Sequence, residues 1–441
     1  MYLKKISFKN FRCFRDLEVD LPQKDVVLIG KNGTGKTSFL QGICYGLVEF
    51  VEILSGTGYE VPDLSKLSEE AWRHVARKSF GFVTIPQYPV TVKLSFSIFG
   101  EDHSSFCSTG IAKGLLGDAG NLGLRQLALQ WRNQAEQWDE KLVLPVVAFY
   151  GVERQWHSSS ERNETLLLMN QGRFPRPAGY RAALNAKVDI DGIRTWFQKM
   201  ILMERRRPEP IFDAVKQAMA RFLEILFGEV NDALKIVVDY DAEVSDIDLQ
   251  ISHGEKVEVM PLFRMSDGVK SVLSMAADIA YRMAVINPQL GERVLEGTPG
   301  IVIIDEVDLH LHPAWQKNII RSFSEVFPKV QFIYTTHAPA VLTNIQAEHI
   351  LTMSDGNVYP LSKDTYGKDV DVILRDIMGA QVRPSVVMNT LSAFHKAIDD
   401  NDLNKAKNIL ETLKKTLGEN DEDVIRAQVT LDLENMEIQE G

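Results

Sequence analysis

One eight-residue segment near the N-terminus constrains the fold of this chain more than any other. Residues 30–37 read Gly-Lys-Asn-Gly-Thr-Gly-Lys-Thr and match the phosphate-binding pattern G-x-x-x-x-G-K-[ST] at every position. The apolar residues 26–29 before it predict a buried strand, and residues 38–41 after it open a helical pattern. A glycine-rich loop between a strand and a helix cradles phosphate groups, so the segment predicts an α/β fold built around a nucleotide.

Each position of the phosphate loop has a chemical reason. The glycines let the backbone curl so that its N–H groups point at the phosphates, Lys36 reaches the β- and γ-phosphates, and Thr37 ligates Mg²⁺. We therefore expect ATP and Mg²⁺ as cofactors. The residues expected to bind the nucleotide here are Gly30, Asn32, Gly33, Gly35, Lys36, Thr37 and Ser38.

A second apolar run, residues 301–304, ends in Asp305 and Glu306. In a phosphate-loop fold we expect this strand beside the loop, with both carboxylates near the metal. Asp305 would hold Mg²⁺ through water, and Glu306 would orient or deprotonate the attacking water. The alternative is that the two acidic residues simply end a strand.

Two further segments carry groups suited to a γ-phosphate. His337 follows the apolar residues 331–334 and can hydrogen-bond a terminal phosphate, although a histidine at a strand end is often structural. Ser266, Asp267 and Gly268 open a long apolar-faced helix, residues 268–287, and form an anion-binding helix start. The alternative for this segment is an ordinary Ser/Asp N-cap.

Composition limits the class of protein. The chain has 441 residues, 45% of them apolar, which is enough for one large domain or two to three smaller ones. It shows no signal-peptide core and no apolar run that approaches a membrane span, and its three cysteines lack metal-ligand spacing. We expect a cytoplasmic protein without membrane partners.

The net charge of −11 argues against a chain whose whole surface attracts nucleic acid. Contact with DNA or RNA would require a partner or a local basic patch. Two arginine groups are candidates for such a patch: residues 205–207, and a looser set formed by Arg173, Arg176 and Arg181. Salt bridges to neighbouring carboxylates are the alternative for both.

The pattern along the chain predicts two parts. Alternating or apolar stretches predict strands at 88–99, 144–152 and within 234–262, and periodic apolar residues predict helices from about 190 to 228. We expect an ATPase domain at 1–385, composed of an N-terminal lobe (1–160), a helical insertion (about 190–230) and a lobe with the catalytic carboxylates (234–385). Residues 386–441 are expected to form a helical, partner-binding extension. Residues 55–85 and 100–140 carry no clear pattern.

These motifs, in this order, resemble the ATP-binding-cassette (ABC) superfamily. The resemblance implies an ABC-type head with a mixed, mostly parallel central sheet. It also implies a head-to-tail homodimer or larger assembly, in which Ser266, Asp267 and Gly268 complete the nucleotide site of another subunit. Residues 10–14, Asn-Phe-Arg-Cys-Phe, resemble the N-terminus of RecF and SMC-like members. By that likeness Arg12 lies near the phosphates, and Gln155, or alternatively Arg154, serves as the glutamine-loop residue at Mg²⁺.

Within the superfamily the chain resembles the OLD-like (AAA-21-like) branch, through Asp-Glu-Val-Asp-Leu-His-Leu-His-Pro at 305–313 and Thr-Thr-His-Ala-Pro at 335–339. It lacks SMC coiled-coil heptads. Its tail lacks a TOPRIM nuclease pattern and is similar to the PtuA-type ATPases of Septu and retron-linked anti-phage systems. This resemblance implies a separate HNH-type nuclease partner, with a retron reverse transcriptase and its DNA as a further candidate. A RecF-like repair ATPase acting directly on DNA and an ATP-binding scaffold with little turnover remain alternatives.

Overall fold

The computed structural model describes residues 1–56, 67, 69–78, 81–109, 122–154, 175–188, 190–204, 209–228, 234–241, 246–254, 256–381 and 383–440. The chain divides into two compact units, Met1–Lys368 and Asp369–Gly441. The boundary expected after residue 385 falls inside the second unit, which begins with α11 (Val370–Asp376).

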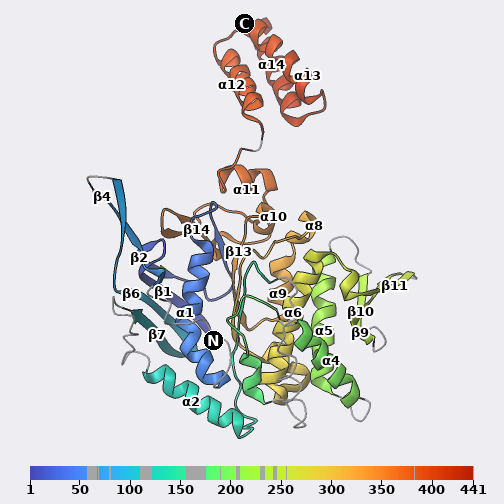
Figure 1. Cartoon of the computed structure of the whole chain (residues 1–441). Helices are drawn as coiled ribbons and strands as arrows, with labels where there is room; N and C mark the ends of the chain where they lie inside the picture. Colours follow the sequence, from blue (N-terminus) through green and yellow to red (C-terminus); the bar gives the residue numbers. More distant parts are fainter. Residues whose placement is uncertain are drawn as a thin grey trace. The chain divides into compact units, whose positions relative to one another are not determined.

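A six-stranded sheet forms the centre of the first unit (Figure 1). Its order is β15 (Asn357–Pro360), β14 (Ile350–Ser354), β3 (Val26–Ile29), β13 (Val330–Thr335), β12 (Gly300–Ile304) and β8 (Val146–Tyr150). Only β15 pairs antiparallel. Every residue of β3, β8, β12 and β13 is buried. Burial on both faces explains why these strands are continuous apolar runs, and the sequence prediction of all four is confirmed.

A second sheet is antiparallel, in the order β2 (Phe14–Asp20), β1 (Tyr2–Phe11), β6 (Val90–Ile98) and β7 (Glu101–Thr109). Its half-exposed strands show the alternation that predicted a strand near 88–99. Helix α1 (Lys36–Ser55) contacts strands of both sheets, and α2 (Leu122–Glu136) packs on α1. The hairpin β4 (Arg73–Lys78) and β5 (Gly81–Pro86) lies in a segment without a clear sequence pattern, and so do β7 and α2.

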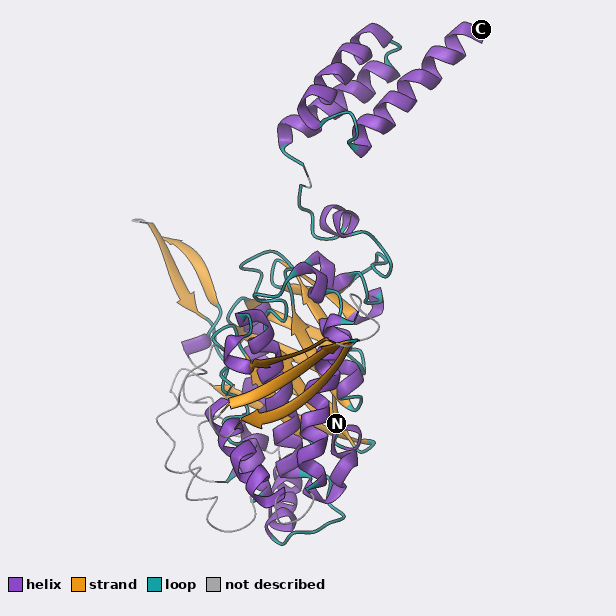
Figure 2. Ribbon diagram, turned by 90° about the vertical axis from the view of Figure 1, so that its right-hand side faces the viewer, coloured by secondary structure: helices purple, strands orange, loops and turns teal. Residues whose placement is uncertain are grey.

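Helices fill the side of the central sheet away from α1. Helix α6 (Asp267–Ile286) contacts β8, and α5 (Pro210–Phe227) packs on α6 and on α9 (Ile319–Val326). Figure 2 shows a small sheet lying across these helices, with the order β11 (Lys256–Pro261), β10 (Asp246–His253) and β9 (Leu234–Asp241). With α4 (Ile190–Glu204), these elements confirm the predicted helical and strand regions between 190 and 287. The short elements are η3 (Arg176–Tyr180), η4 (Leu262–Arg264), η5 (Pro288–Arg293), α7 (Val294–Gly297), α8 (Pro313–Gln316), α10 (Pro339–Leu342) and η6 (Ala347–His349).

The second unit has its own apolar core, formed by α12 (Ser385–Asp399), α13 (Leu403–Leu417) and α14 (Glu422–Glu440). Phe394, Leu410 and Leu431, one from each helix, are buried in it. Arg383 pairs with Asp421 at 3.0 Å, which fastens the start of α12 to the start of α14. The predicted C-terminal helices are therefore confirmed as a separately packed group.

Helix α1 is the one helix among the described residues that is apolar and long enough to cross a membrane by composition. Here it is a core helix, because most of its residues are buried between the two sheets. Two glycines allow this close packing. A Cβ on Gly42 would lie 2.4 Å from Phe8 Cζ, and one on Gly46 would lie 2.4 Å from Leu94 Cδ1. The glycines therefore set the distance between α1 and the antiparallel sheet.

We predict that Gly42→Ala destabilises the protein by about 1–3 kcal/mol, although alanine is the better helix former. The reason is that the Phe8 ring cannot move away, since it packs against Phe11, Phe14 and Phe39 with ring centroids 5.2–5.6 Å apart. Thermal and urea unfolding of the purified variant measure the change.

The matched control is Gly123→Ala on α2, where a Cβ would have no neighbour within 4 Å among the described residues. This substitution should be neutral or stabilise by up to about 1 kcal/mol. Equal unfolding midpoints for the two variants would contradict the packing argument.

Candidate functional site

The sequence motifs meet at the carboxyl edge of the central sheet. The phosphate loop follows β3, Asp305 and Glu306 follow β12, and His337 follows β13. One feature differs from the sequence-based expectation, because β13 lies between β3 and β12, so the strand bearing the carboxylates does not adjoin the phosphate-loop strand. The carboxylate still reaches the loop: Thr37 Oγ1 donates to Asp305 Oδ2 at 2.7 Å.

The phosphate loop has the backbone that its glycines predict. Gly33 and Gly35 have φ of 81° and 102°, in the left-handed region that favours glycine. Gly35 is also the N-cap of α1 and carries no side chain to bond the first N–H groups of the helix. Those groups and the positive end of the helix dipole suit a phosphate. The loop therefore fits the nucleotide that the sequence predicts.

Lys36 lies inside this loop. Its Nζ donates to the carbonyl oxygens of Gly30 at 2.8 Å and Lys31 at 3.1 Å. Burial lowers the pKa of Lys36, while the carboxylates of Asp305 and Glu306 oppose that shift. An ammonium group held inside the loop is the charge that complements a polyphosphate.

The groups at Asp305 fit Mg²⁺. Its carboxylate is buried and accepts from Thr37 on one oxygen and from Thr335 Oγ1, at 2.5 Å, on the other. A hydroxyl and a carboxylate are hard oxygen donors, and Mg²⁺ usually takes one or two protein oxygens together with phosphates and water. In the described part of the chain, no group of three or more His, Cys, Asp or Glu side chains could hold a metal by itself. Thr37 and Asp305 are therefore the residues that would hold Mg²⁺ with a nucleotide.

Glu306 occupies an unusual backbone conformation, with φ of 47°. Its N–H donates to Thr335 Oγ1 at 2.7 Å. Two residues later, Asp308 accepts from Thr336 Oγ1 at 2.6 Å and from the His337 N–H at 3.4 Å. These bonds join the segments after β12 and β13, so Glu306 and His337 belong to one site. Their roles in hydrolysis stay predictions.

The signature segment begins α6. Ser266 is the N-cap residue, yet its side chain makes no capping hydrogen bond, and Ser266 and Asp267 are both exposed. Gly268 is buried against the same chain: a Cβ there would lie 2.1 Å from the His310 carbonyl oxygen. The helix start is thus packed onto the segment after β12 while its serine faces outward.

Arg12 lies beside the phosphate loop but is engaged elsewhere. Its guanidinium forms two bonds to the Glu70 carboxylate, at 2.6 and 2.8 Å, and a third to Gln41 on α1. The neighbouring Cys13 packs on the loop, since a Cβ on Gly35 would lie 2.3 Å from Cys13 Sγ. The contact of Arg12 with phosphates stays a prediction.

Arg154 is a functional candidate that was expected only as an alternative to Gln155. Gln155 lies outside the described residues. Its side chain is 2% exposed and donates to the backbone oxygens of Asp305 at 2.5 Å and Glu306 at 2.7 Å. Burial lowers its pKa to about 10, against the opposing field of Asp305, Asp308 and Glu306, so the group stays charged at neutral pH. No sequence pattern signals these bonds, because they go to backbone atoms about 150 residues away.

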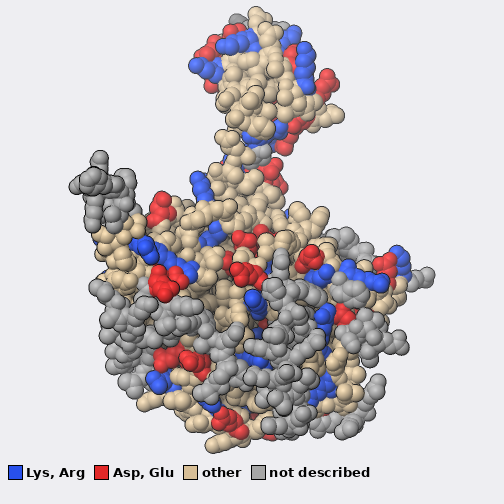
Figure 3. Space-filling model, viewed as in Figure 1, with Lys and Arg blue, Asp and Glu red and all other residues tan. Residues whose placement is uncertain are grey.

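The basic patches receive little support. Arg173 and residues 205–207 lie outside the described residues. Arg176 does not form a surface patch: it is 1% exposed and donates to the carbonyls of Ile286, Asp139 and Leu142. Arg176 is therefore excluded from the candidate patch, because a buried guanidinium with these acceptors cannot reach a phosphate backbone. On the face shown in Figure 3, described acidic and basic side chains are interspersed.

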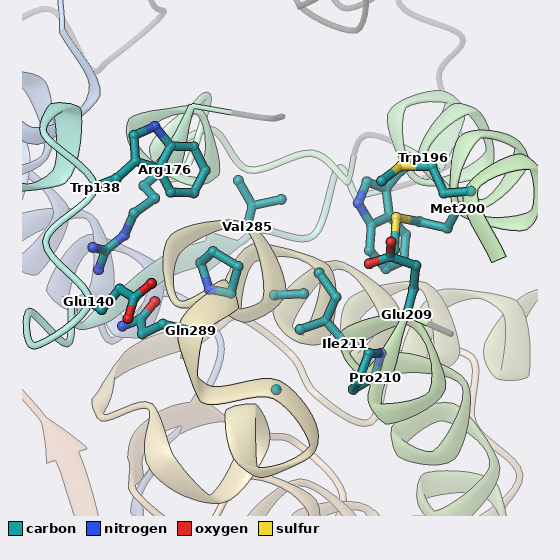
Figure 4. Close-up of a pocket in the computed structure, with 14 residues that line it drawn as sticks. Trp138, Glu140, Arg176, Trp196, Met200, Glu209, Pro210, Ile211, Val285 and Gln289 are labelled. Atoms are coloured by element: carbon teal, nitrogen blue, oxygen red, sulfur yellow. The ribbon is translucent and has the colours of Figure 1, made fainter. Parts of the chain in front are cut away.

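A cavity of about 310 Å³ lies elsewhere in the first unit, among α4 and the adjoining ends of α5 and α6 (Figure 4). Trp196, Met200, Ile211 and Val285 give it apolar walls. Among the described residues that line it, none belongs to the phosphate loop, the catalytic segment or the signature segment. The cavity is separate from the nucleotide site.

Two protein-family models match the chain. One, described as "AAA domain", matches residues 5–191, and the other, described as "AAA domain, putative AbiEii toxin, Type IV TA system", matches residues 155–343. Together they span both sides of the site, from the phosphate loop to His337.

Curated relatives are similar over most of this chain. "Retron Ec83 probable ATPase" of Escherichia coli is 24% identical over 86% of this chain and 76% of its own length. "Septu protein PtuA" of Bacillus mycoides is 26% identical over 78% of this chain and 39% of its own length. "OLD nuclease" of Thermus scotoductus is 23% identical over 76% of this chain and 59% of its own length.

Among solved structures, the SMC head domain of Thermotoga maritima covers 82% of this chain and all of its own, at 15% identity and a TM-score of 0.45.

We predict that Cys13 reports nucleotide binding. It is exposed, whereas Cys44 and Cys107 are buried, so a maleimide should label Cys13 first. Although the residue is exposed, partial desolvation of its sulfur raises the pKa of the Cys13 thiol. Below that pKa the labelling rate should therefore rise about tenfold per pH unit. ATP with Mg²⁺ should slow the labelling, because the thiol packs on the phosphate loop. Mass spectrometry of the labelled peptides measures the rate.

Cys13→Ser should remove the fast labelling phase and serves as the control. Labelling at the same rate with and without ATP, at concentrations that saturate a phosphate loop, would contradict nucleotide binding at this site.

Proposed function

Because the chain belongs to the ABC/AAA-like ATPases of the OLD/RecF branch, we propose that it hydrolyses ATP and closes around ATP as a head-to-tail dimer or larger assembly. The observation that carries this proposal is the hydrogen-bonded path from Thr37 through Asp305 and Thr335 to Glu306. It joins a phosphate-binding helix start to a metal-binding carboxylate and a candidate base.

In the proposed reaction the chain's own groups divide the work. The phosphate-loop N–H groups and Lys36 would hold the β- and γ-phosphates, and Thr37 and Asp305 would hold Mg²⁺, which when bound would supply positive charge to the phosphates. Glu306 orients the attacking water and accepts its proton. His337 donates a hydrogen bond to the γ-phosphate and so distinguishes ATP from ADP.

The dimer is proposed from the signature segment. Ser266 is exposed at the start of α6, and its side chain leaves the first N–H groups of the helix uncapped. An uncapped helix start suits an anionic ligand. By the ABC resemblance that ligand is the γ-phosphate held by another subunit, so each site needs two chains.

We propose that the ATPase serves anti-phage defence by controlling a separate HNH-type nuclease. The retron and Septu relatives support this class over a RecF-like ATPase that acts directly on DNA. The burial of Arg176 and the interspersed surface charges also favour action through a partner.

The proposed docking surface lies on α14 of the second unit. Ile425, Val429 and Leu433 are spaced four residues apart and are 49–58% exposed, while Val424 and Leu431 face the core. Single turns of helix separate the three, so they form one apolar stripe. Exposed charges of both signs border the stripe, namely Asp432 and the ion pair of Glu422 with Arg426. The stripe therefore fits an apolar patch on the nuclease that is itself bordered by charged residues of both signs.

We predict that Glu306→Gln lowers phosphate release at least about 100-fold without loss of ATP binding, because the amide cannot accept the proton of water. Trapped with ATP and Mg²⁺, this variant should at least double its mass in light scattering. Adding Ser266→Arg to it should prevent the increase, since the arginine fills the position of the partner's phosphate.

Lys36→Ala should lose ATP binding altogether. It is the control for both the phosphate-release and the light-scattering measurements. If the unchanged protein releases no phosphate beyond the Glu306→Gln level, the chain is a scaffold. If its mass stays that of one chain with ATP, the two-subunit site is wrong.

We predict that Leu433→Asp weakens binding of the HNH nuclease encoded beside this gene at least about tenfold, because burial of one such side chain contributes about 1.5–3 kcal/mol. Co-expression followed by titration calorimetry measures the affinity. ATPase activity of the variant should be unchanged.

Leu202→Asp is the matched control, since Leu202 is 61% exposed but lies on α4 in the first unit. Full affinity of the Leu433 variant would overturn the docking surface. The lack of any nuclease gene of this class beside the ATPase gene would overturn the assigned partner.

A further inference from the structure

The buried guanidinium of Arg154 joins three separate segments of the candidate site. Arg154 follows β8, and its Nη1 donates to the carbonyls of Gly151 at 3.1 Å and Asp305 at 2.5 Å. Its Nη2 donates to the Glu306 carbonyl at 2.7 Å, and its Nε donates to Ser271 Oγ on α6 at 3.0 Å. One side chain therefore contacts the β8 loop, the catalytic segment and the signature helix.

The geometry of these bonds requires arginine. The guanidinium is a rigid planar fork with five N–H donors, so several acceptors must hold fixed positions around one plane. Lysine offers three donors on one rotatable nitrogen and cannot reach carbonyls and a hydroxyl spread around the edge of that plane. The side chain thus acts as a template for the Asp305 and Glu306 backbone.

This template matters most at Glu306. A non-glycine residue with φ of 47° is in a sparsely populated conformation and persists only where its surroundings impose it. Here the peptide groups on both sides are held. The Glu306 N–H donates to Thr335 Oγ1, and the Glu306 carbonyl accepts from Arg154 and from the Leu309 N–H at 3.0 Å. Loss of the Arg154 bond frees one side of this turn.

The same side chain reaches the signature helix. Ser271 lies in the second turn of α6, after Ser266 at its N-cap. Gly268, between them, packs on the His310 carbonyl of the catalytic segment. Helix α6 is thus fastened to the segment after β12 at two points, through Gly268 and through Arg154.

We propose that Arg154 is a positioning residue that fixes Glu306 for hydrolysis and couples it to the signature helix. The coupling rests on the proposed function, in which Glu306 acts on the ATP of its own chain and α6 contacts the ATP of the other. ATP engaged by α6 in one site then shifts the Glu306 turn that serves the second site. The two sites of the dimer act cooperatively through this arginine.

The test compares Arg154→Lys with Arg176→Lys. Both replace a buried arginine that donates to several carbonyls, but Arg176 lies outside the motifs. Arg154→Lys should lower kcat at least about tenfold and change KM for ATP less than about twofold, because a small misplacement of a reacting group lowers the rate while the phosphate loop is intact. Arg176→Lys should lower only the unfolding midpoint, with kcat per folded molecule unchanged.

Two further measurements separate positioning from stability. Hydrogen exchange of the amides of Glu306 and Leu309 should be faster in Arg154→Lys, with the Phe39 amide of α1 unchanged. Ser271→Ala removes the bond to α6 but keeps the bonds to the carbonyls, so it should lower the Hill coefficient for ATP towards one with a smaller loss of kcat than Arg154→Lys.

Equal kcat for Arg154→Lys and the unchanged protein would overturn the positioning role, and an unchanged Hill coefficient in Ser271→Ala would overturn the coupling. If the unchanged protein shows no turnover at all, the proposed ATPase function fails instead. In that case hydrogen exchange still tests the positioning role of Arg154. Unchanged protection of the Glu306 and Leu309 amides in Arg154→Lys would overturn that role without any activity measurement.

Discussion

The buried carboxylate of Asp305 is the interaction on which the site depends. One of its oxygens accepts from Thr37 at the start of α1, and the other accepts from Thr335 at the end of β13. A buried carboxylate without such partners would be strongly destabilising, so the strand end, the helix start and the neighbouring strand must keep this arrangement together. The same two threonines position the phosphate loop and Glu306. Nucleotide binding and the turn at Glu306 are therefore linked through one side chain.

The sequence predicts much of this fold because its strongest signals are local. Strands β3, β8, β12 and β13 are buried on both faces and read as unbroken apolar runs, and the phosphate loop carries glycines where φ is positive. The order of the strands is not local information. That β13 separates β3 from β12 depends on how the intervening helices pack, and no run of residues records it.

The charged residues whose hydrogen-bond partners the sequence did not predict share one property: those partners are distant in sequence. Arg176 looked like part of a basic group, but its acceptors are the carbonyls of Asp139, Leu142 and Ile286. Arg12 is paired with Glu70, in a segment without a clear pattern. Arg154 bonds backbone atoms, which every residue possesses, so no residue type marks its partners. The tertiary structure is therefore needed before a charged side chain can be assigned as a ligand-binding residue.

The packing within one chain also limits which contacts can change during the proposed ATPase cycle. Within one chain, Gly268 lies against the His310 carbonyl and Arg154 bonds both Ser271 and Glu306, so the signature helix and the catalytic segment are fastened together. The phosphate loop is fastened to the same segment through Thr37 and Asp305. Loss of the γ-phosphate removes an anion but none of these bonds. On the proposed dimer, the contact that hydrolysis weakens is then the one between Ser266 and the nucleotide of the other subunit. In that proposal hydrolysis acts first on the interface between chains, and the bonds of Arg154 to Ser271 and Glu306 carry the change from α6 to the catalytic segment.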